Sequence, residues 1–64
     1  MSNQLTPREL DVLQLMANGA GSKTAEFLGI SYHTVKKYKT HTNEKLNTRN
    51  SAHSVAEGIR RGLI

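Results

Sequence analysis

The stretch that decides the fold is AEFLGISYHTV, residues 25–35. It places a small residue, Ala25, four positions before Gly29, and follows that glycine with the apolar Ile30 and Val35. Gly29 can adopt the positive φ that a sharp reversal of the backbone requires. The small Ala25 lets two helices cross closely on either side of the reversal. This spacing predicts a helix-turn-helix.

Upstream of this unit, the start of a first helix is marked by a capping box. Thr6 can cap the helix, Pro7 fits its first position, and Glu9 lies three residues after the cap. Gly19 is placed to end the helix. Apolar residues follow at helical spacing, namely Leu10, Leu13, Met16 and Ala17. We expect this helix to be scaffold.

The two helices of the predicted helix-turn-helix have clear limits. The first should run from about Ser22 to just before Gly29, with Ala25 and Leu28 on its buried face. The second should be capped by Ser31 and run over 32–46, a segment without glycine or proline that is followed by Asn47.

A fourth helix should follow, capped by Asn50 or Ser51 and closed by Gly62. Its apolar stripe consists of Ala52, Val55, Ala56 and Ile59. No part of the chain alternates as a strand does. The sequence therefore predicts an all-α, compact four-helix domain over residues 5–64, preceded by an N-terminal tail, residues 1–4.

Positive charge is concentrated in one window of the chain. The net charge is +4, and residues 31–49 contain five basic residues against Glu44 alone. These basic residues are Lys36, Lys37, Lys39, Lys45 and Arg49. A projecting basic helix has the width and chemistry to enter the major groove of DNA. An ordinary solvated lysine face is the alternative that charge alone leaves open.

Other classes of function lack the residues they need. The chain has no cysteine, and His33, His41 and His53 are not joined by further ligands, so we expect no metal site and no cofactor. No nucleophile, base and orienting group can be assembled, which argues against an enzyme. No apolar run is long enough to cross a membrane. We expect a cytoplasmic protein with no membrane partner.

The sequence resembles the LuxR-type (GerE-like) helix-turn-helix DNA-binding domains over residues 5–64. The matching blocks are Leu5-Thr6-Pro7-Arg8-Glu9 with Val12-Leu13, Ala25 with Leu28-Gly29-Ile30-Ser31, Thr34-Val35-Lys36, Lys45-Leu46, and Arg60-Arg61-Gly62-Leu63-Ile64. The resemblance implies a transcription regulator whose third helix, about residues 32–46, reads the major groove, and whose fourth helix forms a dimer contact.

The resemblance also implies roles for individual residues. Base contacts are expected from Lys36, Lys37 and Thr40. Phosphate contacts are expected from Ser22, Lys23, Ser31, Thr34 and Lys45, and the chemistry of the neighbouring side chains adds His33, Lys39 and His41. The dimer interface is expected at Ala52, Val55, Ala56 and Ile59.

The chain departs from the family pattern on the inward side of its helices. Thr24 stands where isoleucine is common, and Lys39, Thr42 and Asn43 occupy positions that are often apolar. Lys39 could pack its aliphatic stem and extend its ammonium to a phosphate. The polar residues at these positions leave the packing of the third helix open.

Two hypotheses of function follow from the sequence. The first is a sequence-specific, double-stranded DNA-binding transcription regulator that acts as a homodimer. The second is a stand-alone interaction module that forms a heterodimer with a longer LuxR-type regulator and blocks or redirects it. Affinity for duplex DNA at low salt distinguishes the two, because phosphate contacts dominate binding under that condition.

Overall fold

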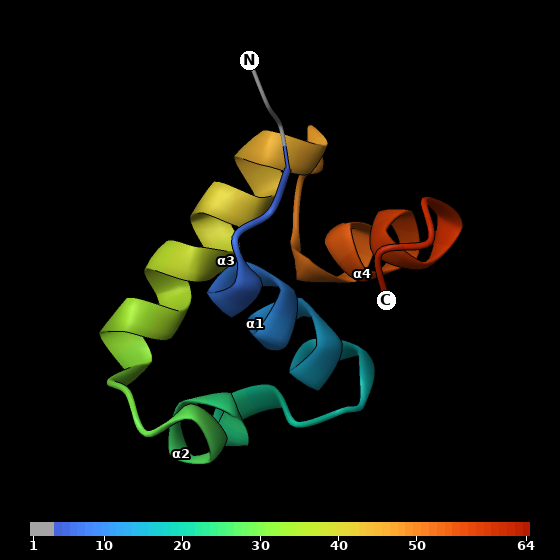
Figure 1. Cartoon of the computed structure of the whole chain (residues 1–64). Helices are drawn as coiled ribbons and strands as arrows, with labels where there is room; N and C mark the ends of the chain where they lie inside the picture. Colours follow the sequence, from blue (N-terminus) through green and yellow to red (C-terminus); the bar gives the residue numbers. More distant parts are fainter. Residues whose placement is uncertain (1–3) are drawn as a thin grey trace.

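The computed structural model describes residues 4–64 and contains only helices and turns over that range (Figure 1). The elements are α1 (Pro7–Ala17), the short 3-10 helix η1 (Gly21–Lys23), α2 (Thr24–Leu28), α3 (Tyr32–Leu46) and α4 (Ser51–Arg60). The all-α, four-helix prediction is therefore confirmed. The first three residues of the expected tail lie outside the described range.

Side-chain caps start three of the helices, as the sequence predicted. The Thr6 hydroxyl accepts a hydrogen bond from the Glu9 amide at 3.2 Å, and the Glu9 carboxylate accepts one from the Thr6 amide at 2.8 Å. Ser31 caps α3 by accepting from the Thr34 amide at 3.1 Å. Asn50, rather than Ser51, caps α4. Each cap satisfies an amide that the first helical turn leaves without a partner.

Two residues in the left-handed region stop helices at the expected places. Gly29 has φ 66° and ψ 34° and ends α2, which turns the chain into α3. Asn47 has φ 58° and ψ 48° and ends α3. Asparagine tolerates this conformation better than most residues with a Cβ atom. The reversal at Gly29 is the turn of the predicted helix-turn-helix.

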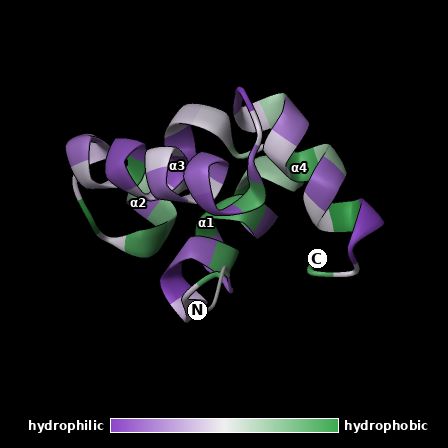
Figure 2. Cartoon of the chain, turned by 90° about the horizontal axis from the view of Figure 1, so that it is seen from above, coloured by the Kyte–Doolittle hydropathy of each residue, from purple (hydrophilic) through white to green (hydrophobic). Residues whose placement is uncertain are grey.

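The centre of the domain is formed by α1 and α3. Val12 and Leu13 from α1 are fully buried, and Val35 and Leu46 from α3 are nearly so. Helix α1 packs against both α3 and α4. In Figure 2 the more hydrophobic residues face the interior, whereas much of α3 is hydrophilic. The small core leaves α3 attached along one side only.

The buried faces of the first two helices differ from the expected ones. On α1 the buried positions are Glu9, Val12 and Leu13, whereas Ala17 is exposed. The expected second helix begins as the 3-10 turn η1, and Thr24 is its fully buried residue. The Thr24 hydroxyl donates to the carbonyl of Gly21 at 2.8 Å, so the buried polar group is satisfied.

Helix α4 buries small residues and exposes its apolar stripe. Ser54 and Gly58 are its buried positions. A Cβ atom on Gly58 would lie 2.8 Å from Cδ2 of Leu13, so glycine permits the close approach of α4 to α1. Ile59, in contrast, is 60% exposed. The stripe expected at the dimer interface therefore lies on the surface of this chain.

Candidate nucleic-acid interface

The outer face of α3 carries the residues expected to contact bases. Lys36, Lys37 and Thr40 are all exposed. The buried residues of the same helix are Val35, Thr42 and Leu46. At 100° per residue these two sets point in opposite directions, so the packing that buries one set projects the other into solvent.

The three outer residues have different hydrogen-bonding capacity. Neither Lys36 nor Lys37 forms an ion pair with another residue of the described chain. The Thr40 hydroxyl donates to the Lys36 carbonyl at 3.0 Å, which leaves its lone pairs and its methyl group available. Glu44 is exposed one turn further along the helix and reduces the positive charge of that end.

Residues expected to contact phosphates surround the N-terminal end of α3. Ser31 and His33 are exposed, and Thr34 is half-buried with its hydroxyl 2.9 Å from that of Ser31. Ser22 and Lys23 are exposed in η1, before α2. His41 is exposed further along α3. The structure thus leaves these polar groups accessible on both helices of the helix-turn-helix and on η1.

Two other expected phosphate contacts are partly engaged inside the domain. Lys39 is half-buried and lines a hollow of about 260 Å³ together with Met16 and Val55. The Lys45 ammonium lies 2.8 Å from the Glu9 carboxylate. Lys39 therefore faces the junction with α1 and α4, and Lys45 connects α3 to the first turn of α1.

The environment of Glu9 stabilises its charged form. Burial opposes ionisation of this carboxylate, but the hydrogen bonds from Lys45 and Thr6 and the positive charge of Lys45 outweigh it. The pKa of Glu9 is therefore lowered from its ordinary value of 4.5. At neutral pH the Glu9 carboxylate is a permanent anion inside the α1–α3 junction.

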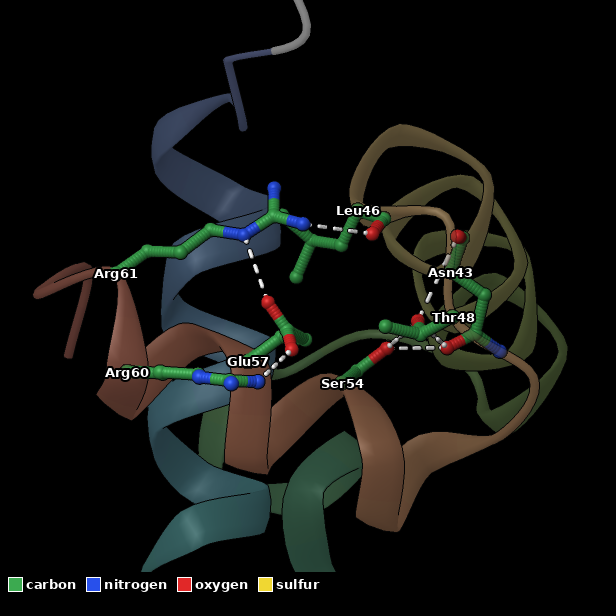
Figure 3. A network of polar contacts seen from close by, with 7 residues as sticks. All are labelled: Asn43, Leu46, Thr48, Ser54, Glu57, Arg60 and Arg61. Atoms are coloured by element: carbon green, nitrogen blue, oxygen red, sulfur yellow. Dashed lines mark hydrogen bonds and ion pairs between the residues drawn. The ribbon is translucent and has the colours of Figure 1, made fainter.

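Polar contacts also fix the C-terminal end of α3, which the sequence analysis did not assign (Figure 3). Arg61 donates to the carbonyl of Leu46 at 3.0 Å and to Glu57 at 2.9 Å. The Arg61 hydrogen bond, the Arg60 hydrogen bond and their charges lower the pKa of Glu57, although burial acts against them. Asn43, an expected apolar position, instead binds Thr48 and Ser54.

The comparison with family models decides what kind of domain carries this surface. The GerE model, described as bacterial regulatory proteins of the luxR family, matches residues 3–57. The chain belongs to the LuxR family. It is therefore a LuxR-type helix-turn-helix, DNA-binding domain of a transcription regulator, and this family is not one of enzymes. The predictions of family, fold and general function are confirmed.

Relatives in the LuxR family cover nearly all of this chain. It is 39% identical over 61 residues to the oxygen regulatory protein NreC of Staphylococcus carnosus, which covers 94% of this chain and 28% of that protein. It is 38% identical over 65 residues to the quorum sensing-dependent transcriptional regulator VjbR of Brucella ovis, covering 100% of this chain and 25% of that protein. The chain thus spans about a quarter of the length of these relatives. No solved structure matches it significantly.

Two further structural findings complete the description of this LuxR-family domain. No helix within residues 4–64 is long and apolar enough to cross a membrane. Over the same residues, no three His, Asp or Glu side chains are grouped so that they could hold a metal ion.

Proposed function

We propose that α3 enters the major groove of duplex DNA and that Lys36, Lys37 and Thr40 contact base edges. The observation that carries this proposal is the exposure of both lysines, with no acidic partner, on the face opposite the core. Helix α3 has 15 residues, or about 22 Å at 1.5 Å per residue. The major groove of B-DNA accepts a single helix of this width.

The chemistry of the three side chains suits base recognition. A lysine ammonium donates to N7 and O6 of guanine, which are acceptors in the major groove. The Thr40 methyl group can contact the methyl group of thymine, and its hydroxyl oxygen can accept from a base amino group. A separate group of residues is proposed to hold the sugar-phosphate backbone: Ser22, Lys23, Ser31, His33, Thr34 and His41.

Lys39 and Lys45 are proposed to act on phosphates in a secondary way. The hydrogen bond to Glu9 uses one of the three donors of the Lys45 ammonium, so two remain. Lys39 packs its stem beside Met16 and Val55 and adds positive charge to the same side of the helix as Val35. Both should contribute less per residue than the exposed lysines.

Dimerisation through α4 is the second element of the proposal. The apolar stripe Ala52, Val55, Ala56 and Ile59 lies at the surface, with Val55 half-buried and Ile59 60% exposed. Pairing two such stripes would remove apolar surface from water. A twofold dimer of this kind predicts two DNA half-sites about one helical turn apart.

A salt series tests the DNA-binding proposal. Fluorescence anisotropy of a labelled random-sequence duplex should give a plot of log affinity against log salt with a slope of about −0.9 per neutralised phosphate. Lys36→Ala and Lys37→Ala should each weaken binding, and each lost phosphate contact should reduce the slope by about 0.9. Arg8→Ala is the matched control, because Arg8 is exposed on α1 and its loss changes the charge equally. Equal effects of all three substitutions would refute the assignment.

The exposed α4 stripe also suits a heterodimer with a longer LuxR-type regulator. Light scattering of the chain alone, with and without duplex DNA, separates the alternatives. A dimer that binds duplex DNA at low salt supports the regulator that acts as a homodimer. A folded chain without affinity for duplex DNA at low salt supports the interaction module instead.

A further inference from the structure

Two groups of polar contacts join the end of α3 to α4, and the first is centred on Arg61 (Figure 3). One terminal nitrogen of its guanidinium donates to the carbonyl oxygen of Leu46 at 3.0 Å, and its Nε donates to Glu57 at 2.9 Å. Leu46 is the last residue of α3, so its carbonyl has no partner within that helix. Arg61 therefore closes the end of α3 from the far end of α4.

The second group is centred on Asn43, in the last turn of α3. Its side-chain oxygen accepts from the Thr48 hydroxyl at 3.0 Å and from the Ser54 hydroxyl. The two hydroxyl oxygens lie 2.6 Å apart. Ser54 is 1% exposed and lies in α4, and Thr48 also donates its amide to the Asn43 carbonyl at 2.8 Å. This group ties α3 to the first half of α4 across the connection between them.

Together the two groups hold a direction and not only a point of contact. Ser54 and Arg61 are seven residues apart, which corresponds to about 10 Å along a helix. Hydrogen bonds weaken when their angles change, whereas apolar contacts tolerate sliding. Two directional anchors at this separation restrict rotation of α4 relative to α3. We call them the α3–α4 joint, made of Asn43, Leu46, Thr48, Ser54, Glu57 and Arg61.

We propose that Ser54 and Arg61 are positioning residues that set the spacing of the DNA half-sites recognised by a dimer. The inference rests on the proposed function, in which α3 binds the groove and α4 forms the dimer. In such a dimer the angle between α3 and α4 determines where the second α3 lies. A tilt of about 10° displaces the far end of a 22 Å helix by about 4 Å, close to the 3.4 Å rise of one base pair.

The test compares spacing preference with affinity for one half-site. A preferred site is first selected by the wild-type chain from random-sequence duplexes. Inverted half-sites are then built with separations that change by single base pairs, alongside a duplex with one half-site. The wild type should bind one separation best and lose at least about threefold in affinity for a change of one base pair.

Variants of the joint should lose this preference while they keep their affinity for one half-site. Ser54→Ala and Arg61→Ala should flatten the spacing profile and leave single half-site affinity within about twofold. Arg61→Lys keeps the charge but cannot form the forked pair of contacts, so its profile should be intermediate. It also carries the test if the alanine variants do not fold, which circular dichroism reveals. Thr6→Ala is the control that weakens the α1 cap without touching the joint, and its profile should match the wild type.

Each remaining outcome overturns a defined part of the account. Variants with the same optimum and width as the wild type would overturn the role of the joint alone. A profile broadened equally in Thr6→Ala would also overturn it, because lower stability would then explain the effect. A wild type that binds duplex DNA without any spacing preference would overturn both the joint and the proposed twofold dimer.

Discussion

The ammonium of Lys45 lies 2.8 Å from Oε1 of Glu9, and this ion pair joins α3 to the first turn of α1. The same Glu9 oxygen accepts the Thr6 amide at 2.8 Å. One carboxylate therefore caps α1 and anchors the helix that is proposed to bind DNA. The Glu9 side chain is only 4% exposed, so little solvent screens the contact on its side.

The Glu9 pair should make stability depend on pH in the acid range. Because the pKa of Glu9 is lowered in the folded chain, its contribution is fully present above the ordinary value of 4.5 and is lost as the pH falls through the lower folded value. Glu9→Gln should lower the free energy of unfolding at pH 7 by about 1–3 kcal/mol, since it removes a charge-assisted hydrogen bond at a mostly buried site. Urea denaturation at pH 7 and at several values below 4.5 measures the difference.

The control for this prediction is Asp11→Asn, which alters an exposed carboxylate on α1. Its effect on stability should be within about 0.5 kcal/mol at neutral pH. A stability difference between wild type and Glu9→Gln that stays constant down to pH 3 would contradict the assignment, because protonation of Glu9 should remove most of it.

Thr42 offers a stabilising substitution. It is 1% exposed, and its hydroxyl has no hydrogen-bond partner among the residues that the structure describes. Thr42→Val replaces the hydroxyl with a methyl group of similar size and should raise the free energy of unfolding by about 1 kcal/mol. Thr42→Ser, which keeps the hydroxyl and loses the methyl group, should lower it. Thermal and chemical denaturation would refute the prediction if Thr42→Val were the less stable of the two.

Gly58 should resist enlargement. Alanine favours a helix over glycine by about 1 kcal/mol, but overpacking a core typically costs about 1–3 kcal/mol. The new Cβ atom would lie 2.8 Å from Leu13, which has no exposed surface and little room to move. Gly58→Ala should therefore lower stability on balance, by up to about 2 kcal/mol, as measured by urea denaturation.

A double-mutant cycle checks the cause of that loss. In a Leu13→Ala background the clashing methyl group is absent, so Gly58→Ala should become stabilising through helix propensity and partial filling of the cavity. If Gly58→Ala cost the same in both backgrounds, contact with Leu13 would not explain its effect.

The local features of the fold could be predicted from sequence because each depends on neighbouring residues. The capping box of Thr6 and Glu9, the reversal at Gly29 and the limits of α3 all arise within a few positions of the chain. The outer face of α3 followed in the same way, since Lys36 and Lys37 lie opposite the apolar Val35 on a helix of known period.

Contacts between distant residues could not be predicted. Glu9 and Lys45 are 36 positions apart, and nothing local distinguishes Lys45 from the exposed lysines. Asn43 was expected at an apolar position, yet it finds hydroxyl partners once the α3–α4 connection folds back. The apolar stripe of α4 also gave no sign that Ser54 and Gly58 would be buried in its place. Burial in so small a domain depends on which helices meet, and periodicity within one helix does not specify that.

The central claim is that the outer face of α3 lies in the major groove, and intermolecular NMR contacts test it most directly. The isotope-labelled chain would be bound to its selected duplex, and filtered experiments would detect protons of the two molecules that lie close together. The account predicts contacts from the Thr40 methyl group and from the Lys36 and Lys37 side chains to thymine methyl or cytosine H5 protons, which line the major groove. Contacts confined to sugar protons, or contacts from other helices and none from α3, would contradict it.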